Sequence, residues 1–249
     1  NPFWDMMHDG AKEIAAENNI ELIYLAPTKP YNLEEQTRLV EDLIEKKVDG
    51  IVLVPVDSAG MVPVIERVNA AGIPIALANT NATGGDVVTF AAIENYDAMT
   101  LVAEYMVDKL GKKGKVIILE GTAGSQTAHD RKQAQDDVLA KYPDMEVLAS
   151  QTAEFQRAKG MQVMENLLQA HPEIDAVLCG NDEMALGAIE ALDAAGRLVG
   201  TLVSGFDGNN DALKAVYEGR MVVTCDQQPG KQAGDPMLAL IDHINGKTV

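Results

Sequence analysis

The sequence predicts an α/β protein built from doubly wound parallel sheets, and three observations favour this fold class. Short apolar runs rich in branched residues alternate along the chain with longer segments whose apolar residues recur every three or four positions. The short runs are apolar almost throughout, as in strands that helices cover on both faces. More of these strand–helix units are present than one compact sheet usually holds, so two lobes are expected.

Seven apolar runs are the predicted strands. They cover residues 20–26, 50–56, 73–79, 115–121, 145–151, 175–181 and 201–207. The segments between them have helical periodicity and are expected to connect the strands. Gly72, Gly111 and Gly196 each follow a helical run, in the position where glycine commonly ends a helix. Pro63 falls in the first turn of its helix, where a missing N–H costs little.

The segment 87–98 breaks this alternation because a strand-like run continues into a polar turn. We expect the chain to cross there from one lobe to the other. The expected lobes are residues 1–93 with 228–249 and residues 94–227. In sheets of this kind ligands bind beyond the carboxyl ends of the strands. The residues that follow each apolar run are therefore the candidates for function.

The composition limits the classes of partner. Lysine and arginine number 20 against 38 aspartate and glutamate residues, and the net charge of −18 disfavours nucleic acid and anionic lipid surfaces. No apolar run approaches the ~20 residues that a membrane-spanning helix needs. A neutral or cationic partner is expected, and nucleic acid is not.

Metal, redox and catalytic chemistry are not indicated. Cys179 and Cys225 form no C-x-x-C motif, and their positions at strand ends fit either two buried thiols or one disulfide. No nucleophile paired with a base stands out, so we expect neither an enzyme nor a cofactor. The histidines lack the spacing of metal ligands; they are His8, His129, His171 and His243.

Polar residues follow most of the predicted strands, and they are mainly amides and single carboxylates. Any one of them could instead cap a helix, because Asn, Asp and Ser are favoured at that position. The stretch Asn181–Glu183 lacks a third ligand or a base, which disfavours a metal or acid–base site. Asp182 and Glu183 are expected to be first-turn acids that complement the helix dipole. The buried stripe of that helix is expected to be Ala185, Ala188, Ile189 and Leu192.

Four stretches of the chain strongly resemble the periplasmic sugar-binding proteins of the ribose-binding type, the substrate receptors of bacterial ATP-driven (ABC) importers. They are "NPFW" (1–4), "GIPI" (72–75), residues 150–188 and residues 205–229. The resemblance covers essentially the whole chain. It implies a periplasmic binding protein of type I, with two doubly wound lobes joined by a hinge and one sugar held in a cleft. It also implies a monomer with a signal peptide, a periplasmic or lipid-anchored location, and a membrane permease as partner.

The resemblance further implies a set of ligand contacts. Phe3 and Trp4 would line the cleft, while Asn1 and Asn181 would pair with sugar hydroxyls. The other positions that match the family pattern are Asn79, Arg131, Phe155, Phe206, Asp207 and Gln227. The chemistry fits on its own terms, because amides, a carboxylate and a guanidinium can pair with two neighbouring hydroxyls. Aromatic rings can cover the apolar C–H patches of a sugar.

Three departures from the family pattern bear on the identity of the ligand. They are Asn79-Thr80 in place of the usual Asp-Arg, Ile93 in place of a small polar residue, and Ala134-Gln135 in place of Gly-Phe. These differences favour another neutral pentose, a hexose, a sugar alcohol or a cyclitol over ribose itself. Residues 1–249 also lack the first apolar strand and the last hinge segment that the family usually has. We expect both segments to belong to the protein beyond this sequence.

The same fold offers an alternative function. It also serves as the effector-sensing domain of lactose-repressor-type transcription regulators and as the sensor domain of receptor kinases. A repressor would carry a helix-turn-helix and a basic surface that faces DNA, and the sequence indicates neither. The predicted function is therefore a solute receptor for a neutral sugar or polyol.

Overall fold

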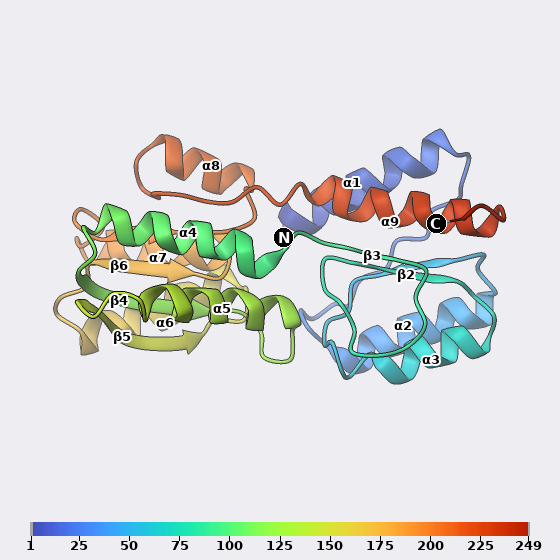
Figure 1. Ribbon diagram of the computed structural model, residues 1–249, viewed down its shortest axis with the longest axis horizontal. Helices are drawn as coiled ribbons and strands as arrows, with labels where there is room; N and C mark the ends of the chain where they lie inside the picture. The colour runs from blue at the N-terminus through green and yellow to red at the C-terminus, as the bar shows by residue number, and fades with distance from the viewer. Residues whose placement is uncertain (1, 249) are drawn as a thin grey trace. The chain divides into compact units, whose positions relative to one another are not determined.

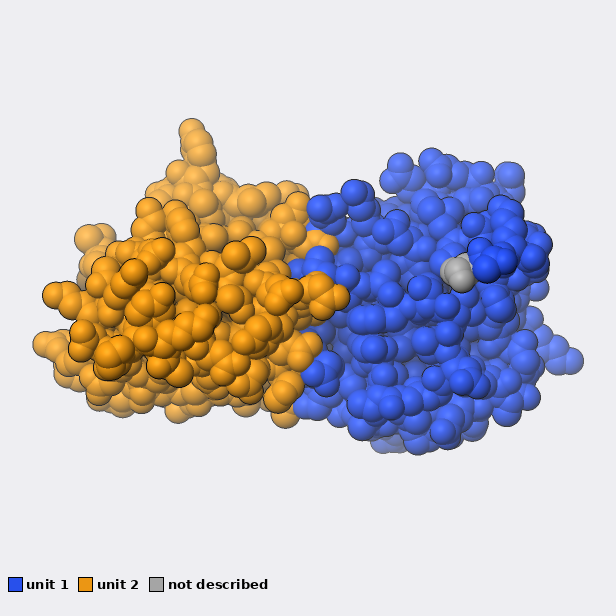
Figure 2. Space-filling model, in the orientation of Figure 1, with its two compact units in different colours: residues 1–93, 124–127, 228–249 blue, residues 94–123, 128–227 orange. Residues whose placement is uncertain are grey.

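The computed structural model describes residues 2–248, and these residues form two compact units (Figures 1 and 2). Unit 1 comprises residues 1–93, 124–127 and 228–249, and unit 2 comprises residues 94–123 and 128–227. Each unit contains one parallel sheet with helices packed on it. The predicted α/β fold class with parallel sheets is confirmed.

Unit 1 is a three-stranded parallel sheet covered by helices on both faces. Ile51 and Leu53 of the first strand lie in an apolar core with α2 and α3. Val52, which points to the other face, packs with Phe3 of α1 and Ala233 of α9. The strand order is β1-β2-β3. The elements of unit 1 are α1 (Pro2–Glu17), α2 (Leu33–Lys46), β1 (Ile51–Leu53), α3 (Val62–Ala70), β2 (Ile75–Ala78), β3 (Phe90–Ala91) and α9 (Pro229–Ile244).

Unit 2 is built in the same way around a four-stranded parallel sheet with the order β5-β4-β6-β7. Val116 and Ile118 of β4 face Met106 of α4 and Val138 of α5 in one core. Helix α7 packs against β6 and β7, with α6 and α8 beside it (Figure 1). The elements are α4 (Asn95–Lys109), β4 (Gly114–Glu120), α5 (Gln126–Leu139), β5 (Met145–Thr152), α6 (Arg157–Ala170), β6 (Ala176–Cys179), α7 (Asp182–Ala194), β7 (Leu202–Ser204) and α8 (Asn210–Tyr217).

The segment after α8 runs back along the end of β7. Isolated parallel bridges join Ser204 to Val223 and Asp207 to Asp226. The backbone N–H of Asp207 donates to the carbonyl of Cys225 over 2.9 Å. These bonds place the chain that leaves unit 2 next to the residues that follow β7.

The predicted helix ends are confirmed. Gly72, Gly111 and Gly196 follow α3, α4 and α7 with φ values of 72°, 66° and 66°. An L-residue with a Cβ rarely adopts this left-handed conformation, which explains the glycines. Pro63 lies in the first turn of α3, also as predicted.

One predicted strand is wrong. Residues 20–26 form no strand, and Ile20, Ile23, Tyr24 and Leu25 are exposed. A strand needs a neighbour for its backbone N–H and C=O groups, and no strand within residues 2–248 pairs with this segment. Its contact to α1 includes the stacking of the Tyr24 ring on His8, with ring centroids 3.9 Å apart.

Both cysteines are free thiols in this structure. Cys179 is buried and Cys225 is half-buried, and burial raises the pKa of both thiols. The sequence left open two buried thiols or one disulfide, and the structure has free thiols. Among residues 2–248, none of the helices combines the length and apolar character that a membrane crossing requires.

Candidate functional site

Arg131 lies at the centre of a polar cluster in unit 2, beside the carboxyl ends of the strands. It belongs to α5 and is buried, with 3% of its surface exposed. Nε donates to Asn95 Oδ1 over 2.9 Å, and Nη1 donates to the carbonyl of Gly180 over 2.9 Å. Nη1 also lies 3.6 Å from Asp207 Oδ1. Contacts from α4 and from the residues that follow β6 and β7 thus orient the guanidinium.

Two predicted aromatic residues flank this guanidinium. Its Cζ atom lies 4.0 Å from the ring centroid of Phe206 and 5.8 Å from that of Phe155. Both distances are within the range of cation–π attraction. Phe155 and its neighbour Glu154 have left-handed φ values of 57° and 53°. Non-glycine residues rarely adopt this conformation, so the loop after β5 holds Phe155 in a strained position.

Gly121, which follows β4, makes room for the ring of Phe155. A Cβ atom at this position would overlap three atoms of the ring. We expect Gly121→Ala to lower the free energy of unfolding by about 1–3 kcal/mol, because the ring must move or the backbone must shift. Urea denaturation followed by circular dichroism measures this loss.

Gly230→Ala is the matched control, because a Cβ there meets its nearest atom at an ordinary 3.7 Å. It is expected to change the free energy of unfolding by less than about 0.5 kcal/mol. Equal effects of the two substitutions would contradict the proposed contact between Gly121 and Phe155.

Asp207 is the buried carboxylate of the cluster. Its φ of 137° is rare for a residue with a side chain. Gln227 Nε2 donates to Asp207 Oδ1 over 2.5 Å. Burial raises the pKa of the Asp207 carboxyl well above its usual value, and the nearby Arg131 opposes this increase. The structure therefore brings together five of the predicted residues in unit 2: Arg131, Phe155, Phe206, Asp207 and Gln227.

Asn181 caps α7 in this structure. Its Oδ1 accepts a hydrogen bond from the backbone N–H of Met184 over 3.0 Å, and its Nδ2 lies 3.4 Å from the carbonyl of Phe155. The capping role that the sequence left open at each strand end thus applies here. One contact to the Phe155 loop also places Asn181 at the edge of the cluster, and its role toward a ligand stays a prediction.

Asp182 has contacts that sequence reasoning missed. It lies in the first turn of α7 with Glu183, as predicted, but it is fully buried. Its Oδ2 accepts from the backbone N–H of Asn209 over 2.9 Å, and its Oδ1 accepts from Thr224 Oγ1 over 2.6 Å. Burial raises the pKa of the Asp182 carboxyl to about 6, although these bonds oppose the increase. Asp182 thereby ties the loop after β7 to the segment that leaves unit 2.

Glu183 behaves differently from its neighbour. It pairs with Arg157 of α6, whose Nη2 lies 2.9 Å from Glu183 Oε1 and 3.0 Å from Asp211 Oδ2 of α8. This network links three helices at a partly exposed position. The expected buried stripe of α7 is confirmed, since Ala185, Ala188, Ile189 and Leu192 are all buried.

Asn79 is the predicted ligand residue of unit 1 at the end of β2. Its φ is 60°, and its backbone N–H donates to the carbonyl of Ala91 over 2.8 Å. Its Nδ2 donates to Gln232 Oε1 of α9 over 3.0 Å, and its Oδ1 accepts from Thr80 Oγ1 over 3.3 Å. Sequence reasoning missed Gln232 because this residue lies within a helix and not after a strand.

Phe3 and Trp4 lie near the start of α1 and contact each other edge to face, with ring centroids 5.0 Å apart. Phe3 is 4% exposed and belongs to an apolar cluster with Met7, Ala78 and Ala233. Trp4 is half-buried and packs against the same cluster. Phe3 is thus a core residue of unit 1, and its contact with a ligand stays a prediction. The predicted contact Asn1 lies outside the described residues.

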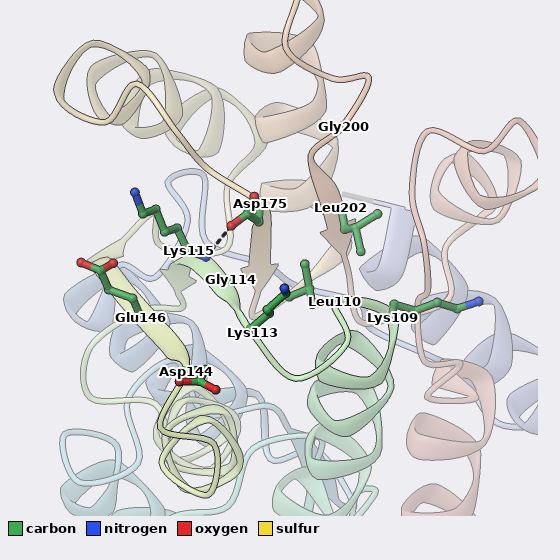
Figure 3. A pocket seen from close by; sticks show the side chains of 10 residues that line it. All are labelled: Lys109, Leu110, Lys113, Gly114, Lys115, Asp144, Glu146, Asp175, Gly200 and Leu202. Carbon is green, nitrogen blue, oxygen red and sulfur yellow. Dashed lines mark hydrogen bonds between the residues drawn. The ribbon is translucent and has the colours of Figure 1, made fainter.

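A pocket of about 590 Å³ lies at the other end of the unit 2 sheet, where the strands begin (Figure 3). Asp175 accepts the backbone N–H of Lys115 over 2.7 Å, and the Lys115 side chain pairs with Glu173. The lysines and acids around this pocket balance in charge, and it contains none of the predicted ligand residues. Its lining consists of Lys109, Leu110, Lys113, Gly114, Lys115, Asp144, Glu146, Asp175, Gly200 and Leu202.

Two parallel α/β units with clustered amide, carboxylate and guanidinium groups beside the strand ends are typical of a binding protein for a small polar solute. The chain belongs to the periplasmic binding protein family, because residues 1–248 match the periplasmic binding protein domain. This finding confirms the family that the sequence motifs indicated.

Relatives of known name support the same assignment. The ribose import binding protein of Bacillus subtilis is 37% identical over 252 residues, which covers 100% of this chain and 80% of the relative. A solute-binding protein of an ABC transporter from Actinobacillus succinogenes, solved with bound D-allose, is 33% identical with a TM-score of 0.94, covering 100% of this chain and 89% of that one. A solute-binding protein from Bacillus halodurans, solved with bound myo-inositol, is 35% identical with a TM-score of 0.94. It covers 100% of this chain and 87% of that one.

Proposed function

We propose that this chain is an extracytoplasmic receptor for a neutral monosaccharide, sugar alcohol or cyclitol, and that it delivers the ligand to the membrane permease of an ATP-driven importer. The observation that carries the proposal is the cluster of Arg131, Asp207 and Gln227 beside the rings of Phe155 and Phe206. The relatives are named for ribose import or were solved with D-allose and myo-inositol, all neutral polyhydroxyl compounds. These names favour a transport receptor over a regulator or kinase sensor.

The chemistry of the cluster suits hydroxyl groups. A hydroxyl both donates and accepts, so it can pair with the Asp207 carboxylate, the Gln227 amide or the Asn181 amide. Each buried polar group left without a partner costs about 1–3 kcal/mol. A sugar whose hydroxyls match these groups is therefore preferred over its epimer.

The two lobes of the proposed receptor are residues 1–93 with 228–249 and residues 94–227. We propose a monomer that binds no nucleic acid and performs no catalysis, located in the periplasm or anchored by lipid outside the cytoplasm. Ligand binding favours one arrangement of the lobes only through interactions that are stronger in that arrangement. That ligand-bound form is what the permease recognises in this proposal.

Asp207→Ala is expected to weaken ligand binding at least tenfold, equivalent to about 1.4 kcal/mol, because a central hydroxyl partner is removed. The probes are D-ribose, D-allose, xylitol and myo-inositol with their epimers. Binding is read by the emission of Trp4, the single tryptophan of the chain, and by thermal stabilisation.

Asp211→Ala is the control, because the Asp211 side chain is 58% exposed on α8. Full affinity in Asp207→Ala would remove Asp207 from the ligand site. Failure of the unmodified protein to bind any probe would contradict the proposed function itself.

A further inference from the structure

Gln232 forms a buried hydrogen bond with Asn79, a residue that the family resemblance implies in ligand binding. Asn79 Nδ2 donates to Gln232 Oε1 over 3.0 Å, and the two residues are 6% and 5% exposed. Asn79 directly follows β2, and Gln232 lies near the start of α9, 153 positions later in the chain. Both belong to unit 1.

One side of this amide pair is apolar. Ala78 and Ala233, the chain neighbours of the two residues, belong to the cluster that contains Phe3 and Met7. A hydrogen bond in such surroundings is stronger than one in water, and a buried amide without a partner is costly. The pair carries no net charge, which suits an uncharged ligand group.

The bond selects one of two orientations of the Asn79 amide. An asparagine side chain can rotate so that its oxygen and nitrogen exchange places. Gln232 presents its acceptor Oε1 to the nitrogen of Asn79, and Thr80 Oγ1 donates to the Asn79 oxygen over 3.3 Å. The opposite orientation of Asn79 would require both partners to reverse their roles as well. With one N–H and one lone pair engaged, the amide retains one donor and one acceptor in a fixed order.

We propose that Gln232 is a specificity-determining residue of the sugar or polyol site, because it fixes the order in which Asn79 offers a donor and an acceptor to two neighbouring hydroxyls. The inference rests on the proposed function and extends it to a residue that acts through Asn79. A hydroxyl pair in the matching arrangement satisfies both groups. Its epimer leaves one of them without a partner.

Gln232→Leu tests this role, since leucine is similar in size and cannot accept a hydrogen bond. Calorimetric titration with D-ribose, D-allose, xylitol, myo-inositol and an epimer of each gives the ratio of dissociation constants within each pair. For the probe that binds best, we expect the dissociation constant of its epimer, divided by that of the probe, to fall about fivefold. This is the effect of one hydrogen bond. The amide of Asn79 is then free to take either orientation.

Gln36→Leu is the matched control in the same unit. Gln36 is also buried, but its amide forms hydrogen bonds with the backbone of the loop that follows β1. Its Nε2 donates to the Val54 carbonyl over 2.8 Å, and its Oε1 accepts from the Val56 N–H over 2.9 Å. This control is expected to lower the melting temperature and to leave the ratio unchanged. If Gln232→Leu behaves in the same way, Gln232 is only structural and the inference is overturned.

Gln232→Glu keeps an acceptor for Asn79 Nδ2 and is expected to retain the ratio of the unmodified protein within about twofold. A loss of selectivity equal to that of Gln232→Leu would overturn the proposed orientation mechanism. Both outcomes leave the proposed function intact, because the unmodified protein still binds a probe. Only the absence of binding by the unmodified protein would overturn the function together with the inference.

Discussion

Replacing Arg131 by methionine is expected to lower the free energy of unfolding at neutral pH by about 3–5 kcal/mol, the cost of leaving a buried charge without its partner. Arg131 lies 3.6 Å from the buried Asp207 and bonds Asn95 and the carbonyl of Gly180. The same substitution is expected to abolish ligand binding, because it removes the group that orients the Asp207 carboxylate. Urea denaturation and calorimetric titration measure the two losses.

The loss of stability should diminish in acid. Burial raises the pKa of the Asp207 and Asp182 carboxyls, and removing the guanidinium raises both further. A carboxyl whose pKa is raised in the folded state stabilises the protein below its unfolded pKa of about 4. This contribution is lost as the pH rises. Arg131→Met is therefore expected to approach the unmodified protein in stability near pH 4.

Arg157→Met is the control for charge removal on a helix surface. Arg157 also pairs with acids, at 2.9 Å from Glu183 and 3.0 Å from Asp211, but its side chain is 33% exposed. Partly exposed pairs of this kind contribute about 1 kcal/mol or less. Similar losses in the two variants at neutral pH would contradict the buried charge cluster around Arg131.

Asp182→Asn is expected to raise the free energy of unfolding above pH 7 by up to about 3 kcal/mol, the equivalent of two pKa units. The folded-state pKa of Asp182 is raised to about 6 from its usual 3.8, mainly by burial. Its protonated form therefore contributes stability that is present below about pH 4 and is lost as the pH rises through about 6. Asparagine does not ionise, so the variant does not suffer this loss.

Denaturation curves at pH 4 and pH 8 measure the difference. The variant and the unmodified protein should be similar at pH 4, where Asp182 is protonated, and should diverge at pH 8. Asp193→Asn serves as control, because the Asp193 side chain is 64% exposed and its pair with Arg220 is 3.4 Å long. A variant that is less stable than the unmodified protein at pH 8 would show that the bonds to Thr224 and Asn209 outweigh the cost of burying the charge.

Most of the fold could be predicted from the sequence because the central strands β2, β4 and β6 are buried on both faces. The apolar centres of the runs 115–121 and 175–181, residues 116–119 and 176–179, lie in β4 and β6. Residues 20–26 have an equally strand-like composition but form no strand. Local preference does not supply the neighbouring strand on which pairing depends.

The candidate site was predictable where its residues follow strands. Asp207 and Asn79 stand at such positions, and the structure places each in a polar cluster. Asn95, Asp182 and Gln232 were not assigned these contacts, because they lie within helices, where a polar residue usually faces solvent. For Asp182 a signal existed: it shares a helix face with Ala185 and Ile189, which are three and seven positions further on.

Asn181 combines two demands in one side chain, since its oxygen caps α7 while its nitrogen lies beside the Phe155 loop. Only Asn, Asp, Ser, Thr and Gly cap a helix well. Evolution can therefore vary this position within a small set of residues without losing the helix. Among them, only asparagine brings an N–H donor on the side chain of a planar amide. New ligand preferences in this lineage are thus expected to arise more readily at positions free of a capping role, such as Gln227.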